Sequence, residues 1–155
     1  MEEEPIACTG GGAGAPIDPD AVKAQAADYH SQGYNCAQAV MCALAPHLGC
    51  DVDTAFRFME GFGLGMGGMS ETCGALSGAV AALGVANSAG AASPTSKGAT
   101  YRLSREAARR FREKNSSTVC HELKGVDTGH GMLRSCPGCI DDAVDIAVDL
   151  LNARA

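Results

Sequence analysis

The sequence predicts an all-α fold, a compact bundle of about five to six helices around a central helix of small residues. Apolar residues recur at the 3.6-residue spacing of a helix in several segments, and no run of alternating apolar and polar residues indicates a strand. Hydrophobic residues make up 46% of the 155 residues and charged residues only 19%, with Ala and Gly dominant and no Trp. This composition is typical of helices whose backbones pack closely, and it argues against a disordered chain.

The length favours one domain preceded by a tail. Residues 1–17 are rich in Glu and then in Gly, which predicts a flexible tail in which Cys8 has no fixed neighbours. Residues 18–155 are expected to form a single helical domain. The start of the chain lacks the basic flank and apolar run of a signal peptide. The most apolar stretch, residues 75–92, is interrupted by Gly and polar residues and is too short to span a membrane.

Charge and cysteine content narrow the classes of function. The net charge of −6 at pH 7 argues against a nucleic-acid partner. With no signal or membrane segment, we expect a cytoplasmic location, where structural disulfides are rare. Eight cysteines in such a chain therefore indicate metal or redox chemistry.

The first third of the chain predicts three helices. One covers residues 21–30, after acidic residues that can cap it. A second begins at Cys36, behind an Asn that can cap it, and Pro46 ends or kinks it. Either Asp51 or Asp53 can cap the third.

A glycine-rich run, residues 61–69, leads into a helix of small residues over 71–85. Gly74, Gly78 and Ala82 recur every four residues on this helix, so neighbouring helices can approach it closely. We expect it to be the central buried helix.

The same run contains a formal G-x-G-x-x-G spacing at Gly63, Gly65 and Gly68. A dinucleotide-binding motif would need a preceding strand and an acidic residue about twenty positions later, and neither is present. The run is instead expected to be a tight connection, open to positive φ, that brings Cys73 close to other backbone.

The second half of the chain predicts three more helices. Residues 99–114 carry six basic side chains around a narrow apolar stripe, which predicts a solvated face or a docking face for a partner. A short helix over 120–123 ends at Gly125. The last helix has an apolar face that runs from Ile140 to Leu151, with Asp residues towards the other face.

Four of the cysteines lie at, or within about one turn of, a predicted helix start. They are Cys36, Cys73, Cys120 and Cys136. A helix N-terminus carries partial positive charge and unpaired N–H groups, so it favours thiolate over thiol. Metals and disulfide chemistry both use thiolates, so we expect these four cysteines to share one pocket.

The remaining cysteines and histidines give weaker signals. Cys136 and Cys139 form a CxxC motif, which is a candidate redox dithiol; Ile140 follows it, so it is not a haem attachment site. Cys42 and Cys50 are expected to be filler residues. Two histidines, which could ligate a metal or shuttle protons, are His121 and His130.

Five segments together resemble a known family. They are residues 35–40, 61–67, 71–78, 120–127 and 136–143. In this order they resemble the small redox-active proteins named for a C…GCAxxG…C…C cysteine pattern, over about residues 22–152. A similar helical domain occurs in split-Soret cytochromes c, whose cysteine pocket is associated with an iron–sulfur cluster. Because this chain lacks CxxCH, the resemblance implies no haem.

The resemblance implies an all-α fold, redox activity and a [2Fe–2S] site. Carried over by motif, the family's four cysteines correspond to Cys36, Cys73, Cys120 and Cys136, the four at the predicted helix starts. The other four cysteines of the chain are additional to the family pattern: Cys8, Cys42, Cys50 and Cys139.

We therefore expect a cytoplasmic redox protein that binds an iron–sulfur cluster for one-electron transfer. Its redox partner protein would dock on the basic helix over 99–114. Two alternatives stay open: a metal-free thiol–disulfide oxidoreductase using Cys136 and Cys139, and a structural zinc module in which the metal only holds the helices together.

Overall fold

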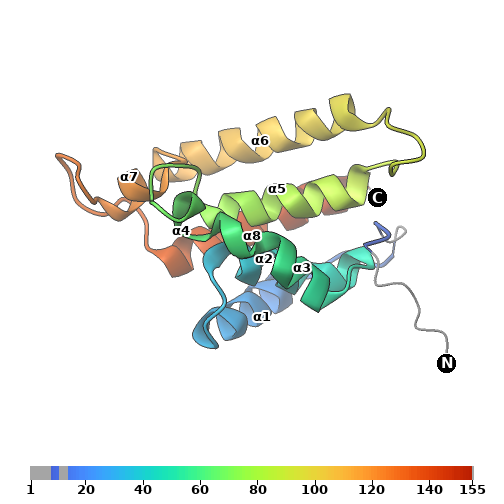
Figure 1. Ribbon diagram of the computed structural model, residues 1–155, viewed down its shortest axis with the longest axis horizontal. Coiled ribbons are helices and arrows are strands. Elements are labelled where there is room, and N and C mark those ends of the chain that lie inside the picture. The colour runs from blue at the N-terminus through green and yellow to red at the C-terminus, as the bar shows by residue number, and fades with distance from the viewer. Residues whose placement is uncertain (1–7, 11–13, 155) are drawn as a thin grey trace.

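The computed structural model describes residues 8–10 and 14–154. Over these residues it is helical and contains no β-strand, only two isolated bridges (Figure 1). The elements, in chain order, are α1 Pro19–Ser31, α2 Cys36–Leu44, η1 Ala45–Leu48, α3 Val52–Met59, η2 Glu60–Phe62, α4 Gly63–Met66, α5 Gly74–Asn87, α6 Lys97–Asn115, α7 Cys120–Lys124 and α8 Cys136–Ala153. The predicted all-α class is confirmed.

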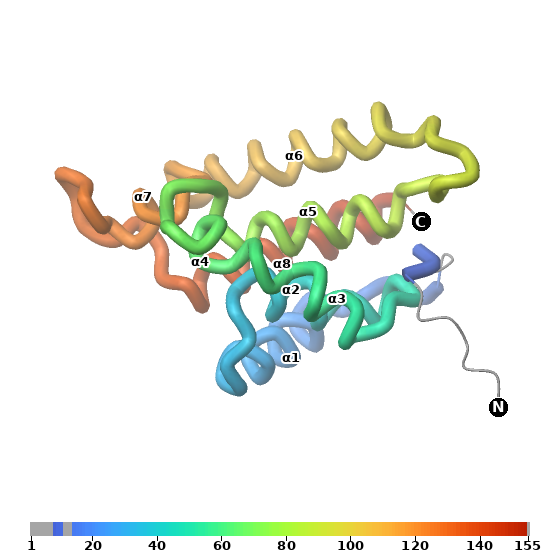
Figure 2. Tube along the Cα trace, viewed as in Figure 1, coloured from blue at the N-terminus to red at the C-terminus, as the bar shows by residue number. Residues whose placement is uncertain are grey.

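Helix α5 is the centre of the bundle. It packs against α2, α6 and α8, and its buried residues include Ala75, Ala79 and Ala82, all fully inaccessible to solvent. Figure 2 shows α6 running beside α5 on one side, with α1, α2 and α3 on the other. The prediction of a central helix of small residues is confirmed.

A glycine permits the close approach of α5 to α2. A Cβ atom at Gly78 would lie 2.7 Å from the carbonyl oxygen of Ala37, well inside contact distance. By contrast, Gly84 on the same helix faces open space, with no heavy atom within 4 Å of an added Cβ. The small residues at Gly74 and Gly78 therefore allow α5 to pack closely against α2.

The four cysteines at predicted helix starts are at helix starts in the structure. Cys36, Cys120 and Cys136 are the first residues of α2, α7 and α8, and Cys73 is the N-cap of α5. Helix α2 has a capping box, in which Asn35 accepts from the Gln38 amide and the Gln38 side chain accepts from the Asn35 amide.

The N-terminal segment differs from expectation. Cys8 forms a disulfide with Cys50, and the amide of Thr9 donates to the carbonyl of Gly49 at 3.1 Å. The expectation that Cys8 has no fixed neighbours is therefore wrong, and Cys50 is a bonding partner and not a filler residue. Of the predicted tail, residues 1–7 and 11–13 lie outside the described residues.

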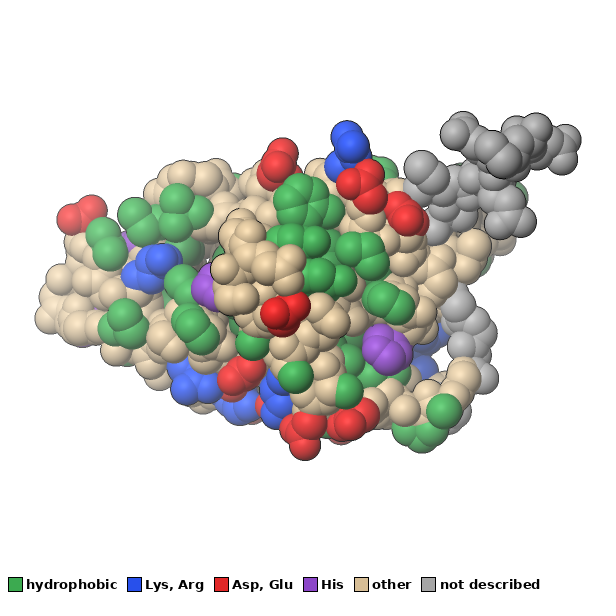
Figure 3. All heavy atoms as spheres, turned by 90° about the horizontal axis from the view of Figure 1, so that it is seen from below, with side chains coloured by type: hydrophobic (Ala, Val, Ile, Leu, Met, Phe, Trp, Pro, Cys, Tyr) green, Lys and Arg blue, Asp and Glu red, His purple; other side chains and the backbone are tan. Residues whose placement is uncertain are grey.

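The surface is mixed in character. Figure 3 views the molecule from the side of α1 and α3, where hydrophobic side chains gather near the centre and both signs of charge lie around them. Among the described residues, no helix combines the length and the hydropathy needed to cross a bilayer.

Candidate redox site: the cysteine cavity

A cavity of about 190 Å³ lies where the N-termini of α2, α5, α7 and α8 meet. Five cysteines line it: Cys36, Cys73, Cys120, Cys136 and Cys139. We call it the cysteine cavity. The structure thus brings together the four cysteines selected from the sequence and adds Cys139, which lies in the first turn of α8.

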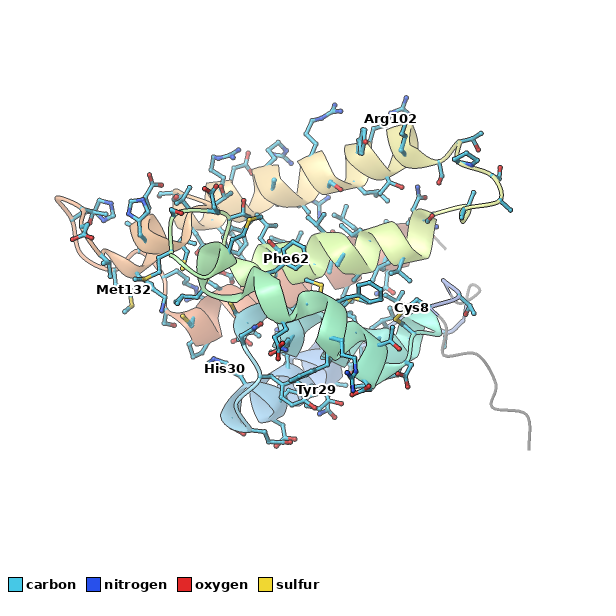
Figure 4. All side chains as sticks on the ribbon, viewed as in Figure 1. Cys8, Tyr29, His30, Phe62, Arg102 and Met132 are labelled. Carbon is cyan, nitrogen blue, oxygen red and sulfur yellow. A yellow bond between two sulfur atoms is a disulfide. The ribbon has the colours of Figure 1, made fainter. Side chains whose placement is uncertain are left out.

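The rest of the cavity wall is partly apolar and partly cationic. Leu64 and Leu123 provide its apolar surface. His30, Lys124 and Arg134 lie around it, and Figure 4 shows His30 at this end of the molecule, far from Cys8 at the other end. His30 comes from the last turn of α1, in a segment without any motif, so nothing in the sequence marks it as a cavity residue.

Backbone hydrogen bonds join two of the cysteine-bearing segments. The amide of Cys73 donates to the carbonyl of Thr118 at 2.7 Å, and the amide of Cys120 donates to the carbonyl of Glu71 at 3.0 Å. These two bonds fix the start of α5 against the start of α7. The positions of Cys73 and Cys120 are therefore set by main chain, not by side-chain packing alone.

The glycine-rich run makes this junction possible. Gly65 has a φ of +55°, and a Cβ there would lie 2.5 Å from the Cβ of Cys120. Its neighbours Leu64 and Met66 also have positive φ, at 53° and 60°. The prediction of a tight connection with positive φ is confirmed, and so is the close approach of other backbone to Cys73.

The cysteines differ in their access to solvent. Cys73 and Cys120 are each 6% exposed and Cys139 is 3% exposed, while Cys36 and Cys136 are half-buried. The Cys73 thiol lies within hydrogen-bonding reach of both Cys36 and Cys139. The site therefore has two thiols near the surface and three inside.

The protonation of these thiols departs from the sequence expectation. The Cys73 thiol and burial raise the pKa of Cys36 well above its usual range. The Cys139 thiol, together with burial, raises the pKa of Cys73 to about 12, and burial raises that of Cys120. Backbone groups of Ala37 and Ala75 lower the pKa of Cys36 and Cys73, as helix starts should, but the opposing effects are larger. In the metal-free protein, Cys36, Cys73 and Cys120 are therefore thiols, not the thiolates expected from helix position.

A cation lies beside the remaining helix-start cysteine. The Cys136 side chain raises the pKa of the Lys124 ammonium, and within residues 8–10 and 14–154 Lys124 forms no ion pair with a carboxylate. Arg134, in contrast, is bound to the Asp142 carboxylate by two hydrogen bonds of 3.0 and 3.2 Å. Lys124 is thus the cation of this wall that is free to offset negative charge on sulfur.

Other predicted candidates lie away from the cavity. His121 Nδ1 lies 3.1 Å from the carbonyl oxygen of Val126, and His130 is exposed in the loop before α8; neither lines the cavity. Cys42 is a fully buried core residue whose thiol donates to the Val52 carbonyl, as expected of a filler cysteine. In the part of the chain that the structure describes, no three His, Cys, Asp or Glu side chains are arranged to hold a single metal ion.

The structure is thus a helical bundle in which five thiols surround one cavity. The chain belongs to the family described as "Putative redox-active protein (C_GCAxxG_C_C)", which matches residues 34–150. No curated protein and no solved structure matches the chain significantly. The resemblance drawn from the five sequence segments is confirmed, and with it the redox character of the family.

Proposed function

We propose that this protein is an electron-transfer protein that binds a [2Fe–2S] cluster in the cysteine cavity. Cys36, Cys73, Cys120 and Cys136 are the proposed ligands. The observation that supports this most strongly is the convergence of four cysteines, from four separate helix starts, on one cavity. Four cysteine thiolates are the usual ligand set of such a cluster.

The chemistry of the cavity wall fits this group. Four thiolates around two ferric ions and two sulfides leave net negative charge, which Lys124 and the backbone amides at the helix starts can offset. Leu64 and Leu123 limit access of water to the sulfurs. The raised pKa values of Cys36 and Cys73 mean that ligation at neutral pH would release protons.

A bound cluster would supply one-electron chemistry at a fixed position. The chain's own residues would hold it, shield it and present it to a partner. For the partner surface we propose α6, on which Arg102, Arg105 and Arg112 form no ion pair within the described residues. Arg102 extends away from the bundle (Figure 4), as docking to an acidic protein would require.

A second candidate function is thiol–disulfide exchange starting at Cys136. This residue is half-buried, begins a helix that Ser135 caps through a 3.1 Å bond from the Gly138 amide, and lies beside Lys124. A cation and a helix N-terminus both activate a cysteine nucleophile. Cys139 would be its partner in this alternative, and a structural zinc module is the third.

A cytoplasmic location is part of the proposal, because a reducing compartment keeps free thiols available to a cluster. Six cysteines of the chain are free thiols. The Cys8–Cys50 disulfide is more usual in an oxidising compartment, so its state in cells bears directly on this part of the proposal.

The experiment is an anaerobic purification followed by an absorption spectrum and metal analysis of the same sample. Visible charge-transfer bands with iron and acid-labile sulfide support the cluster. A colourless protein without metal supports the dithiol alternative, and a colourless protein with zinc supports the structural module. Cys42→Ser is the matched control, since Cys42 is buried but outside the cavity.

A further inference from the structure

The buried cysteine of the CxxC motif faces a cysteine of another helix. Cys139 lies within hydrogen-bonding reach of Cys73, on α5, whereas the side chain of Cys136 lies against Lys124. The contact of Cys139 with Cys73 therefore joins α8 to α5.

The backbone holds both members of this contact in place. The Cys139 amide donates to the Ser135 carbonyl at 2.8 Å in the first turn of α8. The Cys73 amide donates to the Thr118 carbonyl at 2.7 Å. Both side chains line the cysteine cavity, at 3% and 6% exposure. Two neighbouring thiols on different helices that open on the same cavity have the arrangement of a redox dithiol.

We propose that Cys73 and Cys139 form a dithiol that small aliphatic disulfides oxidise to an internal disulfide, and that this disulfide and cluster binding exclude each other. The dithiol itself does not depend on the proposed function. The exclusion does rest on it, because Cys73 is one of the four proposed cluster ligands.

The reaction is a two-step thiol–disulfide exchange. The Cys139 sulfur, as thiolate, attacks one sulfur of the disulfide RSSR, so that a mixed disulfide forms and RS⁻ leaves with the Cys139 proton as RSH. Cys73 then attacks the Cys139 sulfur, the second RS⁻ leaves with the Cys73 proton, and the Cys73–Cys139 bond forms. The protein loses two electrons and two protons, and RSSR gains both to become two RSH.

The size of the cavity sets the class of oxidant. Both thiols are nearly inaccessible from outside, so the disulfide has to enter a space of about 190 Å³. A small neutral disulfide such as 2-hydroxyethyl disulfide meets this requirement, and a folded protein carrying a disulfide does not.

Tryptic mapping tests the pairing in the wild-type protein. The metal-free chain is reduced, treated with 2-hydroxyethyl disulfide, blocked with an alkylating reagent and digested. Cleavage after Lys and Arg leaves Cys73 in peptide 58–97 and both Cys136 and Cys139 in peptide 135–154. The proposal predicts a cross-link between these two peptides, with fragmentation assigning it to Cys139. A disulfide confined to peptide 135–154, or no disulfide at either position, would overturn it.

Variants separate this inference from the proposed function. Cys139→Ser should abolish the cross-link, while Cys42→Ser should keep it. Cys139→Ala should also lack the cross-link. Far-UV circular dichroism of this variant, with helical content like that of the wild type, excludes loss of fold as the cause. In wild-type protein, prior oxidation should reduce iron uptake on anaerobic reconstitution at least tenfold, and reduction should restore it. If the cross-link forms but the protein never binds iron, the proposed cluster is contradicted and the Cys73–Cys139 dithiol is not. Full iron uptake by the cross-linked protein contradicts the exclusion.

Discussion

A Cβ atom at Gly74 would lie 2.6 Å from the sulfur of Cys36. Gly74, the residue after Cys73, is therefore in direct contact with the side chain of Cys36. The same Cβ would lie 3.0 Å from the carbonyl oxygen of Phe62, so backbone hinders a shift of the methyl group away from the Cys36 sulfur. A glycine at this position lets α5 begin where it does and lets Cys36 point into the cavity.

Gly74→Ala should therefore damage the site more than the fold. The added methyl group displaces the Cys36 sulfur, because backbone blocks the other direction. We expect bound iron to fall at least severalfold after anaerobic reconstitution, with helical content unchanged. Gly84→Ala on the same helix, which meets open space, is the control and should bind iron like wild type. Equal iron in both variants would show that Gly74 does not position Cys36.

Gly78→Ala should destabilise the bundle itself. Its Cβ would lie 2.7 Å from the Ala37 carbonyl oxygen, so the methyl group would push α5 away from α2. Overpacking of this kind lowers the free energy of unfolding by about 1–3 kcal/mol. Gly84→Ala should instead stabilise by about 0.5–1 kcal/mol, since alanine favours the helix. Urea unfolding followed by circular dichroism measures both. A Gly78→Ala protein as stable as Gly84→Ala would contradict the close approach.

Asp142→Asn should lower stability at neutral pH and have little effect in acid. Asp142 is 5% exposed; burial raises the pKa of its carboxyl, but bonds from Arg134 and Lys114 outweigh this and hold it below the ordinary value of 3.8. A lowered pKa contributes stability that is present above 3.8 and lost as pH falls through the folded value. We expect a loss of about 1–3 kcal/mol at neutral pH.

Urea titrations at about pH 7 and about pH 3 check this prediction, with the exposed Asp141→Asn as control. The difference between wild type and Asp142→Asn should shrink in acid. A difference that is the same at both pH values would mean that the ion pairs of Asp142 do not contribute.

Cys50→Ser should lower stability and leave the site intact. The disulfide with Cys8 spans 42 positions, and loop closure of this length stabilises by up to about 4 kcal/mol in the chain-entropy model. Neither residue lines the cysteine cavity. We expect a lower midpoint of thermal unfolding under non-reducing conditions and an unchanged iron content and spectrum. Loss of iron would show that this disulfide supports the cavity.

Much of the fold was predictable because it depends on local patterns. The 3.6-residue periodicity located the long helices, and the Gly74–Gly78 stripe identified the central one. The glycine-rich run was expected to have positive φ, and α4 is a left-handed turn in which Leu64, Gly65 and Met66 all have positive φ. Which residues of the run take this conformation depends on its contacts with the rest of the chain, such as the close approach of Gly65 to Cys120.

Four of the five cavity cysteines were predictable from their positions at helix starts, although only two of these helices have a side-chain cap in the structure. Asn35 and Ser135 are side-chain caps in the structure, and both precede cavity cysteines. The contact of Cys139 with Cys73 depends on how α8 packs against α5, which no local pattern encodes. The Cys8–Cys50 pairing was missed for the same reason, since connectivity cannot be deduced from the positions of cysteines.

The most direct test of the central claim is the amount of iron and acid-labile sulfide bound per chain after anaerobic reconstitution. The wild-type protein, Cys42→Ser and Cys139→Ser should each bind about two of both. A single Ser substitution of any proposed ligand should remove most of the bound iron and sulfide. These ligands are Cys36, Cys73, Cys120 and Cys136. Wild-type protein that binds no iron, or substitutions at these four positions that all retain it, would contradict the account.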